Sequence, residues 1–471
     1  MKNKILIIFG LLSVLVLSGC KKYLEVYPKS SIAEEELFAS EIGFQQAITG
    51  IYSQLASRNL YGDNLTMGFV SALAQNYAVS GSGVRFVDSR AINLGSAEVQ
   101  NFSGAIWSTA YSAIAGANKV ILNCDKRRSL LSDQSYAMYL GESLALRAYL
   151  HFDLLRLFGP VYASGVALKA IPYKTTVDQY PIAPSATGEV IQLILKDLER
   201  AEALMNAKDP IVSGALSRRI NFNYYAVKAL QARVLLYSGN NTDAYVAAKK
   251  VTESGRFPFI TAARAGTTAG QKDRLYLSEQ VFCIRVRDLR NWADPGYYRF
   301  NGATTSKLTR PATDYNTLFE TASGGSTDFR YVIGIEPDNS TAFPSKYWQT
   351  YQFNTLDSNR LDQYVPAIRL SEMYYIMAEA APTVQEGITW LNTVRQNRGL
   401  ASLALSIDRA TLQNEILKEY QKEFYAEGQL WYYYKRKVIG KPQFIASSIT
   451  MSAERYKLPI PLTELEFNPT Y

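Results

Sequence analysis

The sequence is almost without histidine, and it has few cysteines. His151 is the one histidine among 471 residues, and Cys20, Cys124 and Cys283 are the three cysteines. Histidine is the commonest general base and metal ligand, and neither Cys124 nor Cys283 has a neighbour at metal-ligand spacing. Histidine-dependent catalysis and a zinc site are therefore disfavoured, and we expect neither a metal nor a cofactor.

Motifs for nucleotide or acyl chemistry are missing as well. The sequence has no phosphate-binding loop, no Gly-x-Ser-x-Gly turn and no His-Glu-x-x-His pattern. His151 lies within an apolar helical pattern, where we expect a hydrogen-bonded core histidine. Cys124 and Cys283 lie in apolar stretches, and the sequence leaves open whether they form a disulfide or are buried free thiols.

Long apolar runs are absent except at the N-terminus. The run at 5–17 has 13 residues, fewer than the roughly 20 that a membrane-spanning helix needs. Two lysines precede it, and the residues LSGC at 17–20 follow it, which is the layout of a secretory signal. The ending resembles the lipobox of bacterial lipoproteins. We therefore predict a cleaved signal peptide at 1–19, lipidation of Cys20 and a lipidated tether at 20–31.

Charge of one sign is not concentrated, whereas aromatic residues are plentiful. The formal net charge is +8, and basic residues alternate with acidic ones along the chain, which disfavours a nucleic-acid partner. The 33 tyrosines and 5 tryptophans provide flat amphipathic rings suited to stacking and hydrogen bonding. This composition is typical of a binding protein more than of an enzyme.

Helical periodicity dominates the chain beyond residue 32. Apolar residues share 3.6-residue faces in 106–124 and 141–159, and the latter segment is apolar on most of its circumference. Residues 221–254 predict two helices and a turn within the length of a tetratricopeptide unit, which needs other units stacked on it. The period is lost at 57–105 and 255–365, which we expect to be aromatic-bearing loops. We also expect a helix from about 187 to 207, helices at 368–380, 386–398 and 412–431, a strand-like run at 280–286 and an extended segment at 455–471.

These patterns predict a mainly helical chain with two aromatic-rich insertions. The length by itself leaves open about three domains or one large one.

Seven segments, in order along the chain, resemble the RagB/SusD family. They are LSGC at 17–20, KYLEVYP at 22–28, GESLALRAYLHFDLLRLFGPV at 141–161, IRLSEMYYIMAEA at 368–380, ITWLNTVRQNRGL at 388–400, EYQKEFYAEGQLW at 419–431 and LPIPLTELEFNP at 458–469. The resemblance implies a mainly α fold of tetratricopeptide-like helix pairs in an α-α superhelix, with irregular loop-rich insertions and a few short strands. It implies a single domain at 32–471, with an N-terminal half at about 32–254, a loop-rich insertion at about 255–365 and a C-terminal helical part at about 366–471. It further implies a non-enzymatic lipoprotein at the outer-membrane surface of Bacteroidetes-type bacteria, held to the membrane through its lipid anchor only. It also implies a partner, a SusC-like TonB-dependent transporter that the protein caps and supplies with nutrients, usually oligosaccharides.

A glycan ligand sets requirements that the two irregular regions meet. Pyranose rings have apolar faces and hydroxyl rims, so their site needs an aromatic platform flanked by Asn, Asp or Arg. In relatives the ligand surface is drawn from loops at comparable places. The candidate ligand-binding residues are Asn76, Tyr77, Arg85 and Phe86 in the first region and Trp292, Tyr297 and Tyr298 in the second. For each of them taken singly, packing in the core or against the transporter is the alternative role.

Four glutamates recur every four residues near the C-terminus: Glu415, Glu419, Glu423 and Glu427. Two of them could serve as acid and base in a glycoside hydrolase. The interpretation that we favour is ion pairing, because carboxylates at this spacing commonly face basic side chains. The available partners are Arg395, Arg398, Lys435 and Arg436. The rival functions are therefore a subunit of the same type of complex that binds peptides or another nutrient, a lipid-anchored glycoside hydrolase and a protein-binding scaffold.

Overall fold

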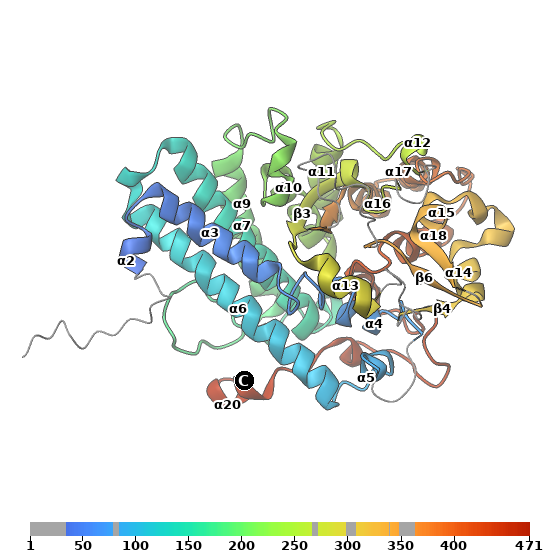
Figure 1. The fold of residues 1–471 in the computed structure, drawn as a ribbon, viewed down its shortest axis with the longest axis horizontal. Helices are drawn as coiled ribbons and strands as arrows, with labels where there is room; N and C mark the ends of the chain where they lie inside the picture. Colours follow the sequence, from blue (N-terminus) through green and yellow to red (C-terminus); the bar gives the residue numbers. More distant parts are fainter. Residues whose placement is uncertain (1–33, 79–83, 266–271, 298–307, 339, 348–362) are drawn as a thin grey trace, which may run out of the picture.

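The structure is a computed structural model that describes residues 34–78, 84–265, 272–297, 308–338, 340–347 and 363–471 (Figure 1). The predicted signal peptide, the tether and Cys20 lie outside these residues. Helices make up most of the described chain and strands are few and short, which confirms the predicted fold class. Within the described ranges, no helix has the length and apolarity needed to cross a membrane.

Long helices packed side by side form the N-terminal half, on the left of Figure 1. Serine and asparagine side chains cap four of these helices by accepting the N–H of a residue in the first turn, as Ser96 does from Val99 at the start of α6. Helix α3 lies on α6, α6 on α7 and α7 on α9. The helices are α3 (Glu41–Leu55), α6 (Ala97–Lys126), α7 (Asp133–Phe158), α9 (Thr187–Met205), α10 (Tyr224–Tyr237) and α11 (Asn241–Thr252).

Helix α7 is the centre of this half. Every residue from Leu140 to Phe158 is buried, as its apolar circumference predicts. Gly141 allows α9 to approach closely, because a Cβ at this position would lie 2.6 Å from Cγ of Met205. A single large hydrophobic cluster surrounds α7 and extends into the C-terminal half.

The predicted helix pair at 221–254 is confirmed. Helices α10 and α11 are joined through Gly239, whose φ of +82° is readily adopted by glycine. Helix α11 packs against α16 (Leu370–Ala380), and α16 packs against α17 (Val384–Gln396), so the stack continues across the loop-rich insertion.

The helix predicted at 412–431 is wrong in its length. The structure has α18 (Arg409–Glu423), a turn and then α19 (Gln429–Lys437). The turn holds Ala426 and Gly428 at φ +60° and +77°. A Cβ on Gly428 would lie 2.1 Å from the carbonyl oxygen of Leu65, so the break is set by close contact with a distant segment.

Two further expectations about irregular structure are wrong. The segment predicted as an open loop at 57–105 is an inner segment, in which residues 60–77 are all buried. The C-terminal segment predicted as extended contains α20 (Leu462–Phe467), which begins directly after Pro461. Helix α20 and the C-terminus lie beside α6 at the lower edge of Figure 1.

The strands form three small antiparallel sheets. The predicted strand at 280–286 is confirmed as β3 (Gln280–Arg285), which pairs with β7 (Tyr364–Arg369). The other sheets are β1 (Lys169–Ile171) with β2 (Ser185–Ala186), and β4 (Arg310–Pro311), β6 (Thr341–Pro344) and β5 (Ile335–Asp338) in that order. The remaining helices are short: α2 (Glu34–Leu37), α4 (Phe69–Leu73), α5 (Val87–Arg90), α8 (Tyr162–Gly165), α12 (Ala262–Ala265), α13 (Leu289–Tyr297), α14 (Ala312–Phe319) and α15 (Phe329–Gly334).

Candidate functional site

Residues of three distant segments meet around Arg85. Its guanidinium donates from Nη1 to the hydroxyl of Tyr297 at 2.7 Å and from Nη2 to Oδ2 of Asp63 at 3.0 Å. The guanidinium carbon lies 4.5 Å from the ring centre of Phe86 and 5.5 Å from that of Phe102. We call Asp63, Arg85, Phe86, Phe102 and Tyr297 the Arg85 cluster.

The start of α6 holds the Arg85 cluster in place. Glu98, in the first turn of α6, accepts the backbone N–H of Phe86 at 2.8 Å and that of Ser89 at 2.9 Å. Phe86 itself is at φ +70°, an uncommon conformation for a non-glycine residue. The carboxylate of Glu98 therefore fixes a strained turn, and this turn places Arg85 over the rings of Phe86 and Phe102.

The electrostatics of the cluster keep a cation at the surface. Burial raises the pKa of Tyr297, and the charge of Asp63 raises it further, so the phenol stays protonated and donates to Asp63. Burial by itself lowers the pKa of Arg85, but Tyr297 and Asp63 outweigh it, and the net pKa is raised. The side chain of Arg85 is 41% exposed, whereas that of Asp63 is fully buried. The cluster thus presents a fixed guanidinium, backed by aromatic rings, to solvent.

The structure brings together only part of the predicted site. Arg85, Phe86 and Tyr297 touch one another, as described above. Asn76 and Tyr77 are buried nearby: Asn76 accepts the N–H of Ala426 at 3.1 Å, and the hydroxyl of Tyr77 donates to a backbone carbonyl at 2.5 Å. The rings of Tyr77, Phe86 and Tyr297 are therefore covered by protein. The side chain of Trp292 and the whole of Tyr298 lie outside the described residues.

The glutamates at 419, 423 and 427 lie in a buried ion network. Glu423 accepts from Arg398 at 2.7 Å, from Arg330 at 3.1 Å and from Arg369. The network contains five carboxylates and five basic groups, and we call it the central ion network. Its members are Glu279, Asp328, Glu419, Glu423, Glu427, Arg330, Lys346, Arg369, Arg395 and Arg398.

This network confirms ion pairing for the glutamate series. Burial by itself raises the pKa of Glu423, but the charges of Arg398 and Arg369 outweigh it and hold the pKa well below its ordinary value. A general acid must hold a proton near neutral pH, so Glu423 is unsuited to that role. Two expected partners are wrong: Lys435 donates to carbonyl oxygens at the end of α7, and Arg436 pairs with Glu379.

His151 and the two cysteines serve the core. His151 is fully buried; Nδ1 lies 2.9 Å from the carbonyl oxygen of Arg147, and Nε2 accepts the N–H of Lys174 at 3.1 Å. Burial lowers the pKa of His151 to about 3, so the ring is neutral and Nδ1 carries the proton. This confirms the predicted core histidine. Cys124 and Cys283 are both buried free thiols, which answers the question that the sequence left open.

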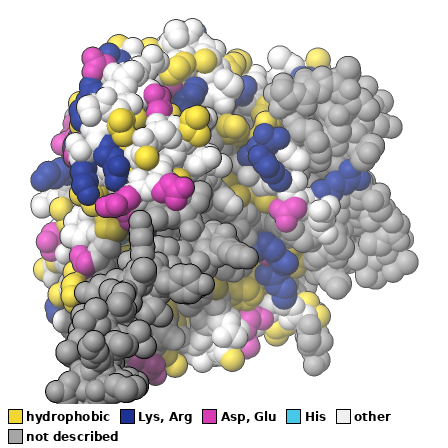
Figure 2. Space-filling model, turned by 60° about the vertical axis from the view of Figure 1, so that its left-hand side comes forward, with side chains coloured by type: hydrophobic (Ala, Val, Ile, Leu, Met, Phe, Trp, Pro, Cys, Tyr) yellow, Lys and Arg dark blue, Asp and Glu magenta, His cyan; other side chains and the backbone are white. Residues whose placement is uncertain are grey.

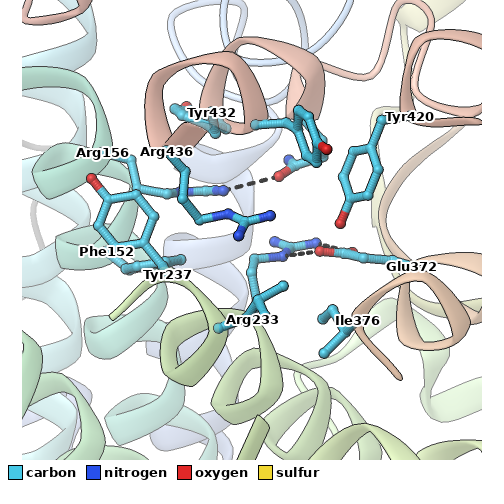
Figure 3. Close-up of a pocket in the computed structure, with 12 residues that line it drawn as sticks. Phe152, Arg156, Arg233, Tyr237, Glu372, Ile376, Tyr420, Tyr432 and Arg436 are labelled. Atoms are coloured by element: carbon cyan, nitrogen blue, oxygen red, sulfur yellow. Dashed lines mark hydrogen bonds and ion pairs between the residues drawn. The ribbon is translucent and has the colours of Figure 1, made fainter. Parts of the chain in front are cut away.

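The arginine-lined cavity in Figure 3 is too small for a sugar. Arg156, Arg233 and Arg436 converge on it from α7, α10 and α19, and Glu372 pairs with Arg233. Its volume is about 30 Å³, and a cavity of this order accommodates water. Among the residues that the structure describes, no group of three or more His, Cys, Asp or Glu side chains is arranged to hold a metal ion.

The surface charge fits the sequence expectation. Figure 2 shows acidic and basic side chains interspersed on one face, without a continuous basic stripe on the described part of that face. Nucleic-acid binding needs a concentrated basic surface, so this face does not favour it.

Sequence reasoning missed Asp63, Glu98 and Phe102, which hold Arg85 and Phe86. Asp63 lies in the segment taken for a loop, and its burial is invisible without the fold. Glu98 gave a signal, because it stands two residues after Ser96 in the first turn of α6, where acidic side chains are favoured.

The fold defines the protein as a tetratricopeptide-like helical protein, and comparisons with known proteins identify the family. The chain belongs to the SusD/RagB family. A family profile described as "Starch-binding associating with outer membrane" matches residues 22–236, and the profile of the SusD family matches residues 292–459. Members of this family are generally binding proteins associated with the outer membrane, not enzymes.

Individual relatives are similar over almost the whole chain. A SusD-like protein of Formosa agariphila is 24% identical over 92% of this chain and 90% of its own length. A crystal structure of a SusD superfamily protein from Bacteroides thetaiotaomicron covers 92% of this chain and 99% of its own, with a TM-score of 0.73 and 22% identity. A SusD-like carbohydrate binding protein from Bacteroides vulgatus has a TM-score of 0.71 at 16% identity, covering 92% of this chain and 97% of its own. At these identities the solved structures support the fold alone.

Proposed function

We propose that the protein is a cell-surface lipoprotein that binds a glycan and passes it to a SusC-like TonB-dependent transporter in the outer membrane. Membership of the SusD/RagB family is the observation that carries this proposal. The signal-peptide pattern at 1–19 supports a lipid anchor at Cys20, from which a single domain at 32–471 follows. No covalent chemistry is involved, because the protein captures its ligand and hands it over.

The Arg85 cluster is the proposed position of the ligand, together with Trp292 and Tyr298. The charged, partly exposed guanidinium of Arg85 can donate to sugar hydroxyls. Tyr77, Phe86 and Tyr297 are covered in the structure and support this surface from beneath. In the proposal, Trp292 and Tyr298 therefore provide the stacking faces.

Retention in native gels cast with polysaccharides tests the proposal. The domain without its signal peptide and Cys20, residues 21–471, is run in soluble starch, xylan, laminarin and levan beside Arg85→Ala and Trp292→Ala. Arg200→Ala is the matched control, because the side chain of Arg200 is 49% exposed and pairs with Asp125 on a different surface. Selective retardation by one polysaccharide, weakened in both site variants and kept in the control, is the expected result. Retardation by none of them would contradict glycan binding and favour a peptide or another nutrient.

A further inference from the structure

A second open cleft lies between α6, the connection at 172–182 and α20. Its volume is about 190 Å³, and we call it the C-terminal cleft. It is separate from the Arg85 cluster, although both use α6. Phe102 of the cluster and Tyr111 of the cleft are nine residues apart in sequence, which is about 13 Å along the axis and about half a turn around it. The two places therefore face different sides of the helix.

The walls of the cleft are fixed by hydrogen bonds between its segments. The hydroxyl of Tyr111, on α6, donates to the carbonyl oxygen of Pro172 at 2.7 Å. The amide of Asn468, which is buried directly after α20, donates to the carbonyl oxygen of Ile182 at 2.9 Å. A site whose walls are tied together in this way needs little ordering when a ligand binds.

Two aromatic rings at the cleft stand in solvent. Tyr180 is 79% exposed and Phe467 is 60% exposed. The backbone of Tyr180 is nevertheless held at both ends, because its N–H donates to Asp178 at 3.0 Å and its carbonyl accepts from Lys174 at 2.8 Å. Lys174 and Asp178 also pair with each other at 2.6 Å. The fold thus fixes the backbone of Tyr180 while its ring contributes little to the core, which is typical of a residue that contacts a ligand.

The remaining lining groups favour a neutral polar ligand. Asp178 and Gln179 place a carboxylate and an amide side chain beside the rings. Lys174 is the one lysine in the lining, and its charge is paired with Asp178. Glu464 also lines the cleft, and its carboxylate repels negative charge, so an anionic ligand such as a phosphate is disfavoured. Aromatic faces with a polar rim match the apolar face and hydroxyl rim of a pyranose.

We propose that the C-terminal cleft is a second saccharide subsite, which takes one neutral pyranose ring against Tyr180 and Phe467. This inference rests on the proposed function, and it adds a second contact for a glycan already held at the Arg85 cluster or for a neighbouring chain of the same polysaccharide. Two weak subsites on one protein increase retention on a polymer far beyond either alone.

The test compares Tyr180→Ala and Phe467→Ala with Leu462→Ala in the domain without its signal peptide and Cys20, residues 21–471. Leu462 is a matched control, because it lies on α20 and is 65% exposed but does not line the cleft. Native gels are cast with graded soluble starch, xylan, laminarin and levan, and the apparent affinity is taken from the retardation. Both cleft variants should bind about tenfold more weakly, and the control should stay within about twofold of the wild type.

Each other outcome has a definite meaning. Retardation of the wild type that both cleft variants retain in full would overturn the subsite and leave the proposed function standing. An equal loss in all three variants would assign the effect to exposed apolar side chains in general, and would overturn the subsite. If none of the four polysaccharides retards the wild type, the subsite falls together with glycan binding.

Discussion

Replacing Glu423 by glutamine is expected to destabilise the fold by about 3–5 kcal/mol. The side chain is almost completely buried and contacts the guanidinium groups of Arg330, Arg369 and Arg398. Glutamine keeps the volume of the side chain but removes the charge. Because the central ion network balances five carboxylates with five basic groups, the variant leaves one buried positive charge without compensation.

The size of the expected effect can be worked out as a melting temperature. The entropy of unfolding is about 2.1 cal/mol/K per residue, which over roughly 440 residues amounts to about 0.9 kcal/mol/K. A loss of about 4 kcal/mol therefore lowers Tm by about 4 °C. Calorimetry of the purified mature chain, with urea unfolding as a second measure, provides the comparison.

Glu415→Gln is the matched control, since it makes the same change at the least buried end of the same glutamate series. The side chain of Glu415 is 15% exposed; it pairs with Lys418 at 2.8 Å and lies 3.7 Å from Arg395. We expect a loss below about 1 kcal/mol, hence a Tm lower by about 1 °C or less. Equal changes in the two variants, or a Tm of Glu423→Gln within about 1 °C of the wild type, would refute the reasoning.

Three further predictions concern pH, thiols and the anchor. Burial lowers the pKa of His151 to about 3, whereas an unfolded imidazole has a pKa of about 6.5. The free energy of unfolding gained from the neutral imidazole is therefore complete above pH ~6.5 and decreases as the pH falls towards 3, by about 2 kcal/mol at pH 5. Urea unfolding at pH 7 and pH 5 should show this loss, and His151→Gln should remove it. Burial raises the pKa of Cys124 and of Cys283 to about 12, so a maleimide should label neither thiol until the chain unfolds. Because both are free thiols, dithiothreitol should leave Tm unchanged. Rapid labelling of the folded protein would contradict the structure. Cys20→Ala should move the protein from the membrane fraction to the soluble fraction, and an unchanged distribution would argue against lipidation.

Much of the fold could be predicted because it depends on local periodicity. The segment 141–158 of α7 is apolar on most of its circumference, and this pattern by itself predicts that the helix is buried. The break between α18 and α19 could not be predicted in the same way. It depends on the contact between Gly428 and the carbonyl of Leu65, more than 350 residues earlier in the chain.

The candidate site was less predictable, because side-chain direction decides it. The sequence shows that Tyr77, Phe86 and Tyr180 are aromatic residues outside long helices, but it does not show which rings point inward. Tyr77 is buried and donates to the carbonyl of Met67, and Phe86 is buried against Phe102 of α6. In contrast, Lys174 and Asp178 hold the backbone of Tyr180 while its ring stands in solvent. Exposed aromatic rings, on which a glycan site depends, thus emerge only from the tertiary structure.

Calorimetric titration of the mature chain with soluble polysaccharides tests the central claim most directly. Wild type, Arg85→Ala, Trp292→Ala and the control Arg200→Ala are titrated with starch, xylan, laminarin and levan at equal mass concentration. The account predicts saturable heat with one of these glycans, at least about tenfold weaker binding in the two site variants and unchanged binding in the control. Absence of heat with all four glycans for a folded wild-type protein, or equal binding by all four proteins, would contradict it.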